Sequence, residues 1–121
     1  MKDEPTAVPV TLPVSLLGES QAITDSYRNV RIAAVNDHEI RMSVMTSGFD
    51  WHHHPDSDEV FLGVDSELVI ELEDREIVLG PGELFTVPKG TLHRTRPATA
   101  RSVNITFERR DAATVFTKAP R

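Results

Sequence analysis

From residue 28 onward, the chain is a succession of short runs in which hydrophobic and polar residues alternate. Alternation with a period of two residues is the pattern of a β-strand, because successive side chains of a strand point to opposite faces. The clearest run lies at 102–107, where Val103, Ile105 and Phe107 alternate with polar residues. Comparable runs lie at 29–35, 39–46, 67–72, 75–79 and 84–87. The pattern therefore predicts a β-rich domain.

The segments between these runs are rich in residues that favour turns. Gly, Pro, Asn and Asp break regular structure or adopt the backbone angles that tight turns need. Such residues occur at 36–38, 47–50, 73–75, 80–83 and 88–90. Many short strands at near-regular spacing are typical of a β-sandwich or closed barrel. Because no long helical pattern is present to cover a parallel sheet, we predict an antiparallel all-β fold.

The N-terminal part of the chain has a different pattern. Pro5, Pro9 and Pro13 exclude a helix or a central strand, so residues 1–14 are predicted to form an extended arm. Such an arm is either disordered or paired with a sheet edge of its own or of a partner subunit.

A short helix is expected after this arm, and a loose tail at the C-terminus. Residues 16–26 fit one helix with Leu16 and Leu17 as its apolar contacts, and the residues that end the chain carry no strand pattern. The predicted organisation is an N-terminal arm and helix at 1–27, a β-barrel at 28–108 and a C-terminal tail at 109–121.

Composition narrows the class of protein. The chain has 121 residues, which fits one domain, and a net charge of −6. This acidic excess disfavours nucleic acid or an anionic membrane as the main partner. There is no apolar run of about 18 residues, so no membrane-spanning helix is expected. The chain has no cysteine, which excludes disulfides and thiolate metal ligands. The first residues lack the order of a signal peptide, and we expect a cytoplasmic location.

The stretch WHHHPDSDEVF at 51–61 contains three consecutive histidines. In an extended strand His52 and His54 share one face, and His53 points to the other. Two imidazoles rarely suffice for a divalent metal, so further ligands are required. Glu59 opens the next apolar run and is placed to face back toward the histidine pair. Asp56 and Asp58 are interpreted as loop carboxylates that fix either the intervening loop or the second nitrogen of a histidine.

His93 is a further candidate ligand, because it enters a predicted strand directly after a Pro-x-Gly turn at 88–90. Histidines and a carboxylate on neighbouring strands form a compact nitrogen and oxygen site, which suits iron, manganese, nickel, copper or zinc. From spacing alone, a metal site and a polar histidine-rich loop both remain open.

The two segments resemble the two motifs of the cupin superfamily. His52 and His54 match its His-x-His pair, and four residues separate His54 from Glu59 as in the first motif. The second motif is matched from Gly82 through the Pro-x-Gly turn to His93. The likeness extends over about residues 28–108.

The sequence departs from the cupin pattern at three positions that are not ligands. The first motif's leading glycine is displaced to Gly48. Its second glycine is replaced by Ser66, and the asparagine expected after His93 is replaced by Pro97.

The resemblance implies a jelly-roll β-barrel that holds one divalent transition metal in its mouth. The implied ligands are His52, His54, Glu59 and His93. Glu59 is also the candidate catalytic residue, because a carboxylate that leaves the metal acts as a general base. Arg41 and Met45 share one face of a strand leading toward this site and are candidates to line its cavity. Arg94 and Arg96 have the opposite parity to His93 and are expected to point away.

Three classes of function follow from the resemblance. The first is a small metalloenzyme acting on a small oxygen-rich organic molecule, with dioxygenase-type chemistry at a redox-active metal or isomerase or lyase chemistry at a Lewis acid. The second is a non-catalytic binding or sensory module with a structural or vestigial metal site, because one fold serves many functions. The third is an assembly role with a vestigial site, and in every case a homodimer is expected.

Overall fold

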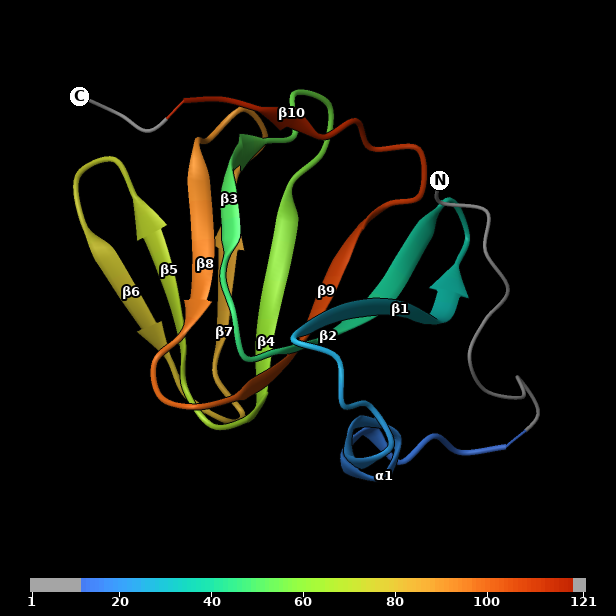
Figure 1. Cartoon of the computed structure of the whole chain (residues 1–121). Helices are drawn as coiled ribbons and strands as arrows, with labels where there is room; N and C mark the ends of the chain where they lie inside the picture. Colours follow the sequence, from blue (N-terminus) through green and yellow to red (C-terminus); the bar gives the residue numbers. More distant parts are fainter. Residues whose placement is uncertain (1–11, 119–121) are drawn as a thin grey trace.

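The computed structural model describes residues 12–118, so the predicted extended arm falls mainly outside the described residues. Within 12–118, one helix precedes ten strands that form two five-stranded sheets (Figure 1). Each paired strand runs antiparallel to its neighbour, which confirms the predicted antiparallel all-β fold. The elements are α1 (Leu16–Gln21), β1 (Tyr27–Val35), β2 (His38–Met45), β3 (Phe49–His53), β4 (Glu59–Asp65), β5 (Leu68–Leu72), β6 (Glu76–Leu79), β7 (Leu84–Val87), β8 (His93–Pro97), β9 (Ser102–Arg109) and β10 (Val115–Phe116).

The two sheets interleave strands that are distant in sequence. The first sheet has the order β1-β2-β9-β4-β7, and the second has the order β10-β3-β8-β5-β6. The first hydrophobic core contains buried residues from both sheets. It consists of Met45, Phe61, Leu68, Ile70, Leu79 and Val87. The predicted apolar faces of 67–72 and 84–87 therefore form the closed part of the barrel.

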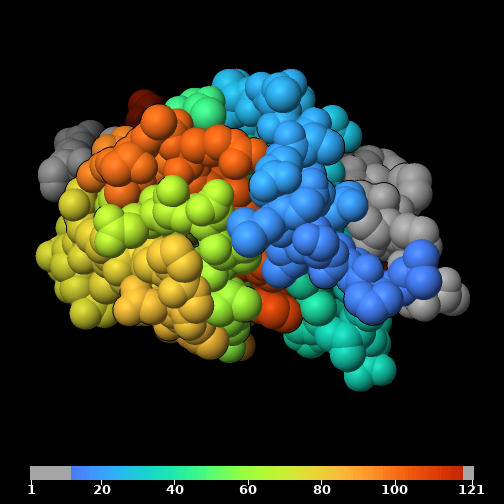
Figure 2. Space-filling view, turned by 90° about the horizontal axis from the view of Figure 1, so that it is seen from below, coloured from blue at the N-terminus to red at the C-terminus, as the bar shows by residue number. Residues whose placement is uncertain are grey.

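A second hydrophobic cluster lies on the other face of the first sheet. Met42 and Val44 of β2 pack there with Val103 and Ile105 of β9. Leu16 in α1 belongs to the residues that cover them. Figure 2 shows the helix and its neighbouring residues as a blue band lying across this side of the molecule. Since side chains alternate along a strand, the polar residues of β2 and β9 face the barrel interior instead.

The helix is shorter than predicted. It ends at Gln21 rather than near 26, and Leu17 is 49% exposed, so the predicted packing of that side chain is wrong. Ser15 caps the helix by accepting a hydrogen bond from the backbone N–H of Gly18 at 3.1 Å. The β-branched Ile23 and Thr24 follow the last turn and favour extended backbone. Within residues 12–118, no helix is long and apolar enough to cross a membrane.

The turn at Ser66 explains one departure from the cupin pattern. Ser66 has φ +59°, in the left-handed region that glycine adopts most easily. The backbone therefore keeps the shape that the missing glycine would give, at the expense of a strained serine. Gly82 and Gly90, which flank the segment before His93, also have positive φ values of +80° and +81°.

A C-terminal strap, defined as residues 110–118, follows β9 and contains β10. Figure 1 shows it crossing from the end of β9 to the edge of β3. In β10, Val115 pairs with His53 and Phe116 pairs with His52. The sequence predicted only a tail at 109–121. The pairing of β10 with β3 shows that the strap extends the second sheet.

Candidate metal centre

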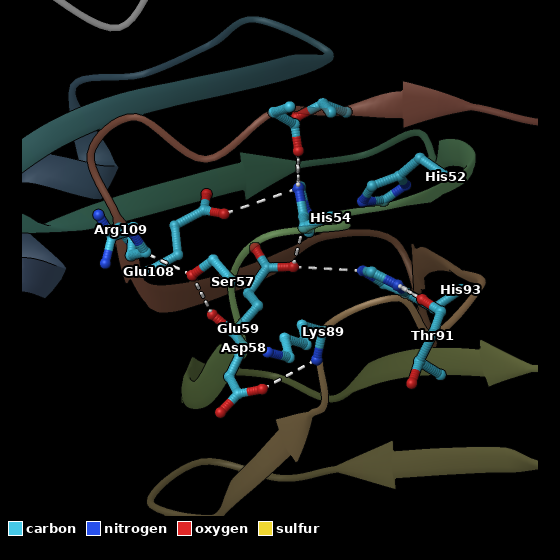
Figure 3. Close-up of polar contacts among 12 residues, drawn as sticks. His52, His54, Ser57, Asp58, Glu59, Lys89, Thr91, His93, Glu108 and Arg109 are labelled. Atoms are coloured by element: carbon cyan, nitrogen blue, oxygen red, sulfur yellow. Dashed lines mark hydrogen bonds and ion pairs between the residues drawn. The ribbon is translucent and has the colours of Figure 1, made fainter.

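Four side chains converge inside one end of the barrel (Figure 3). His54 follows directly after β3, which carries His52, while Glu59 is the first residue of β4 and His93 is the first residue of β8. One ligand atom from each of the four lies within 4.8 Å of those of the others, and all four residues are buried. The structure therefore brings together the four residues predicted as metal ligands.

Strand pairing explains this convergence. In the β3–β8 pair, His52 stands directly opposite His93. His52 and His54 both line the cavity, whereas His53 is half-buried and does not. This confirms that His52 and His54 share one face and that His53 points to the other.

Each imidazole is oriented by a backbone carbonyl. His52 Nδ1 lies 2.7 Å from the carbonyl oxygen of Asp50, and His93 Nδ1 lies 2.8 Å from that of Thr91. His54 Nδ1 lies 3.0 Å from the carbonyl oxygen of Ala113 in the strap. A carbonyl only accepts hydrogen bonds, so each Nδ1 carries the proton. The lone pair of each neutral imidazole is then on Nε2, the atom available to bind a metal.

Glu59 lies between two of these nitrogens. Its Oε1 is 3.1 Å from His54 Nε2 and 3.2 Å from His93 Nε2. His54 Nε2 is buried and makes no hydrogen bond of good geometry to any residue within 12–118. If both imidazoles were neutral with Nδ1 protonated, the lone pairs on their Nε2 atoms would point at the negatively charged carboxylate of Glu59, which is unfavourable. The arrangement therefore requires a cation, either a proton on an imidazole or a metal ion, and the four donor atoms fit a metal ion.

The electrostatics of the site follow from burial and from these contacts. Burial, and secondarily the charge of His93, lower the pKa of His52 to about 4. Burial disfavours the charged form of His54 too, but the contact with Glu59 and the charges of Glu59 and Glu108 outweigh it and raise the pKa of His54. For Glu59, burial opposes ionisation, yet the contacts with His54 and His93 lower the pKa to about 2. An ionised Glu59 beside neutral His52 is ready to bind a cation.

The loop between the histidines and Glu59 is fixed by its carboxylates, as predicted. Asp58 Oδ1 accepts a hydrogen bond from the backbone N–H of Lys89 at 2.8 Å, which links this loop to the turn before His93 (Figure 3). Asp56 Oδ1 accepts one from the backbone N–H of Ala113 at 3.1 Å. These bonds connect the ligand-bearing loop to both segments that orient the histidines.

A cavity of about 260 Å³ adjoins the candidate metal centre. Arg41 and Met45 line it, which confirms their predicted orientation, together with Phe61. The other residues of its wall, beyond the candidate ligands, are Tyr27, Asn29, Ser43, Phe49, Thr95, Asn104, Thr106, Glu108 and Thr114. The barrel interior is therefore closed by apolar packing at one end and open to a polar cavity at the other.

Two arginines that were expected to point away from the site do so. Arg94 Nε donates a hydrogen bond to Glu71 at 2.8 Å, and its guanidinium lies 4.9 Å from the centre of the Trp51 ring. Arg96 contacts Glu76 at 3.3 Å. None of these residues lines the cavity, so Trp51 lies on the outward face of the second sheet, where it is buried and Arg94 covers its ring.

Some residues of the site were not found from the sequence. Phe49 lies three positions before His52, yet both line the cavity, because the β3–β8 register shifts between them. Glu108 was not predicted either, although its Oε2 lies 3.7 Å from His54 Nδ1. The alternation of β9 was the available signal for Glu108, since it shares the face of Asn104 and Thr106.

The comparisons with known proteins agree with this fold and site. Residues 38–106 match the Cupin domain family. A Bacillus subtilis (strain 168) protein, Uncharacterized protein YdbB, is 43% identical over 84% of this chain and 90% of its own. A cupin-2 domain containing protein from Shewanella frigidimarina has a TM-score of 0.74 at 26% identity, over 79% of this chain and 93% of its own. The DMSP lyase DddQ from Ruegeria pomeroyi has a TM-score of 0.66 at 22% identity, over 77% of this chain and 52% of its own. The family match and the close relative show that the chain belongs to the cupin family.

Proposed function

We propose that this cupin is a small metalloenzyme that binds one divalent transition metal and acts on a small oxygen-rich organic molecule. The proposed ligands are His52, His54, Glu59 and His93. The observation that carries the proposal is the position of Glu59 Oε1, 3.1 Å and 3.2 Å from two Nε2 atoms whose rings are already fixed through Nδ1.

The donor set suits iron, manganese, nickel, copper or zinc. When bound, such a metal polarises a coordinated oxygen and, if it is redox-active, also exchanges electrons. The chain's own residues hold the reacting molecule. Phe49 and Phe61 provide apolar cavity wall close to the ligands, and polar side chains of β2 and β9 provide hydrogen bonds.

Glu59 is the proposed catalytic residue. Its pKa of about 2 keeps it ionised at neutral pH, so its carboxylate is available as a ligand. A carboxylate at the edge of the cavity is also in place to take up a proton from a bound molecule. Dioxygenase-type and isomerase or lyase chemistry are both compatible with this role, and the DMSP lyase shares only the fold at this level of identity.

The first test is elemental analysis by mass spectrometry of untagged protein purified without added metal or chelator. We expect about one equivalent of a transition metal per chain. Absence of metal, together with absence of uptake on titration, would overturn the proposal. The catalytic part is tested by adding azide to protein loaded with Co²⁺. A changed visible absorption spectrum indicates an open coordination position, whereas an unchanged spectrum indicates a closed, structural site and a non-catalytic module.

We also propose a homodimer in the cytoplasm, on the basis of the family resemblance and the composition. Sedimentation equilibrium of the full chain tests the dimer, and a mass of one chain would contradict it.

A further inference from the structure

Besides the candidate metal ligands and apolar side chains, the cavity has a group of polar side chains in its wall. This wall is built by inward-facing residues of β1, β2 and β9. The register places Asn29 opposite Ser43, and Ser43 opposite Asn104. All three line the cavity, as does Arg41, two positions before Ser43 on the same strand. The proposed metalloenzyme gives these groups only a general role in hydrogen bonding, because none of them is a candidate ligand.

Asn104 is the first indication of what this wall binds. Its side chain is 1% exposed, and its Oδ1 makes no hydrogen bond within residues 12–118. A buried amide oxygen without a partner destabilises the protein, because it has lost its hydrogen bonds to water. Because Asn104 lines the cavity, a bound molecule that donates a hydrogen bond removes this cost. A hydroxyl is such a donor, and a carboxylate is not.

Arg41 is the second indication. It is 8% exposed, its Nη1 lies 3.2 Å from Glu39 Oε1, and its Nε donates a hydrogen bond to Asn29 Oδ1. Asn29 Nδ2 in turn donates to Ser43 Oγ at 2.7 Å. The guanidinium is therefore held in one orientation at the cavity wall. A planar, oriented guanidinium is suited to a carboxylate.

Glu108 limits the number of carboxylates. It lines the same cavity, and an ionised carboxylate only accepts hydrogen bonds. A ligand with a second carboxylate near Glu108 would meet like charge, whereas a ligand hydroxyl would donate to it. The polar wall thus combines the buried guanidinium of Arg41, which is paired with Glu39, with several groups that accept hydrogen bonds from hydroxyls.

The size of the cavity sets the scale of the ligand. Its volume of about 260 Å³ corresponds to roughly nine water molecules at ~30 Å³ each. A molecule of roughly a dozen non-hydrogen atoms is therefore the largest that fits without rearrangement.

We propose that the cavity binds a small monocarboxylic hydroxy acid, with its carboxylate at Arg41, a hydroxyl at Asn104 and its remaining oxygens toward the metal ligands. The last part rests on the proposed metalloenzyme, while the contacts with Arg41 and Asn104 belong to the chain alone.

The test compares matched molecules by isothermal titration calorimetry on the full chain, both metal-loaded and metal-free. One set has six carbons, namely gluconate, sorbitol and hexanoate. The other has three, namely glycerate, glycerol and propionate. We expect the hydroxy acid of at least one set to bind about tenfold tighter than both its polyol and its simple acid. If neither hydroxy acid is preferred, the inference is wrong, whatever the metal content.

Variants separate recognition by Arg41 from chelation by the metal. The double variant Glu39→Gln/Arg41→Gln removes both charges of this ion pair together. We expect it to keep the wild-type metal content and to lose the preference for the hydroxy acid over the polyol. Asn104→Ala should weaken the hydroxy acid and the polyol alike, by about tenfold. Arg96→Gln, on the outer surface, is the matched control and should bind as wild type.

The two proposals fail in different ways. If the protein binds no metal but still prefers the hydroxy acid, only the metalloenzyme proposal is contradicted. A metal-loaded protein that binds polyol, simple acid and hydroxy acid equally contradicts the ligand class only. Retention of the preference in Glu39→Gln/Arg41→Gln contradicts the role of Arg41.

Discussion

His54 Nδ1 lies 3.0 Å from the carbonyl oxygen of Ala113, although the two residues are 59 positions apart. The bond joins a candidate metal ligand to the C-terminal strap, and Thr114 in the same strap lines the cavity. The strap is itself attached to the loop after His54, since Asp56 accepts a hydrogen bond from the backbone N–H of Ala113. The orientation of His54 therefore depends on a segment that contributes no ligand.

Loosening this attachment should weaken metal binding. Asp56→Ala removes the acceptor for the backbone N–H of Ala113, so the carbonyl of Ala113 holds the His54 ring less firmly. Loss of such an outer contact typically lowers metal affinity by about 10- to 100-fold, and we expect the lower end. Competition with a chromophoric chelator measures the affinity. Asp74→Ala is the control, because Asp74 is exposed in the turn between β5 and β6 and is not part of the strap or of the loop that follows His54. Equal affinities in the two variants would show that the strap does not orient His54.

Substitution of neighbouring histidines should have opposite outcomes. His52→Ala and His93→Ala each remove one of four proposed ligands, and both should purify with less than about a tenth of the wild-type metal. His53→Ala lies between two ligands but faces away from the cavity, so its metal content should equal that of wild type. Elemental analysis distinguishes these results. Similar metal loss in all three variants would contradict the assignment of faces in β3.

Metal affinity should fall as the solution becomes acidic. The pKa of His54 is raised, so below that pKa a proton must leave the imidazole before Nε2 binds a metal. His52, with a pKa of about 4, is already neutral and adds no such competition above that pH. Affinity should therefore drop by about tenfold per pH unit below the pKa of His54. Chelator competition between pH 8 and pH 5 provides the measurement, and constant affinity over this range would argue against His54 as a ligand.

Ser66→Gly should stabilise the protein. Ser66 has φ +59°, which strains a residue with a Cβ atom but not glycine. Relief of this strain, less the greater freedom of glycine in the unfolded chain, leaves a gain of about 0.5–1 kcal/mol in the free energy of unfolding. Asn36→Gly is the matched control, because Asn36 has φ +54° and asparagine tolerates this region better than serine. Thermal denaturation of metal-free protein should show the larger gain for Ser66→Gly. A loss of stability would mean that the serine hydroxyl makes a contribution greater than the strain.

The sequence was sufficient for most of the strands and for the four candidate ligands, because alternation and motif spacing are local properties, but it did not predict β10. It was insufficient for Phe49, since the irregular register between Phe49 and His52 reverses the expected face. It was also insufficient for Ala113, which acts through a backbone carbonyl that every residue has. The helix ends early because the β-branched Ile23 and Thr24 follow its last turn. This local signal was present in the sequence, but the predicted range of 16–26 did not take it into account.

The alternation of β2 and β9 separates folding from specificity. Their outward residues, such as Met42 and Val103, pack under the N-terminal helix, while their inward residues, such as Arg41 and Asn104, meet the cavity. Substitutions at the inward positions change which molecule fits without removing the apolar contacts of the outer layer. Under the proposed function, a barrel built in this way acquires a new ligand through a few changes along two strands, while most of its folding free energy stays with the neighbouring positions that are not altered.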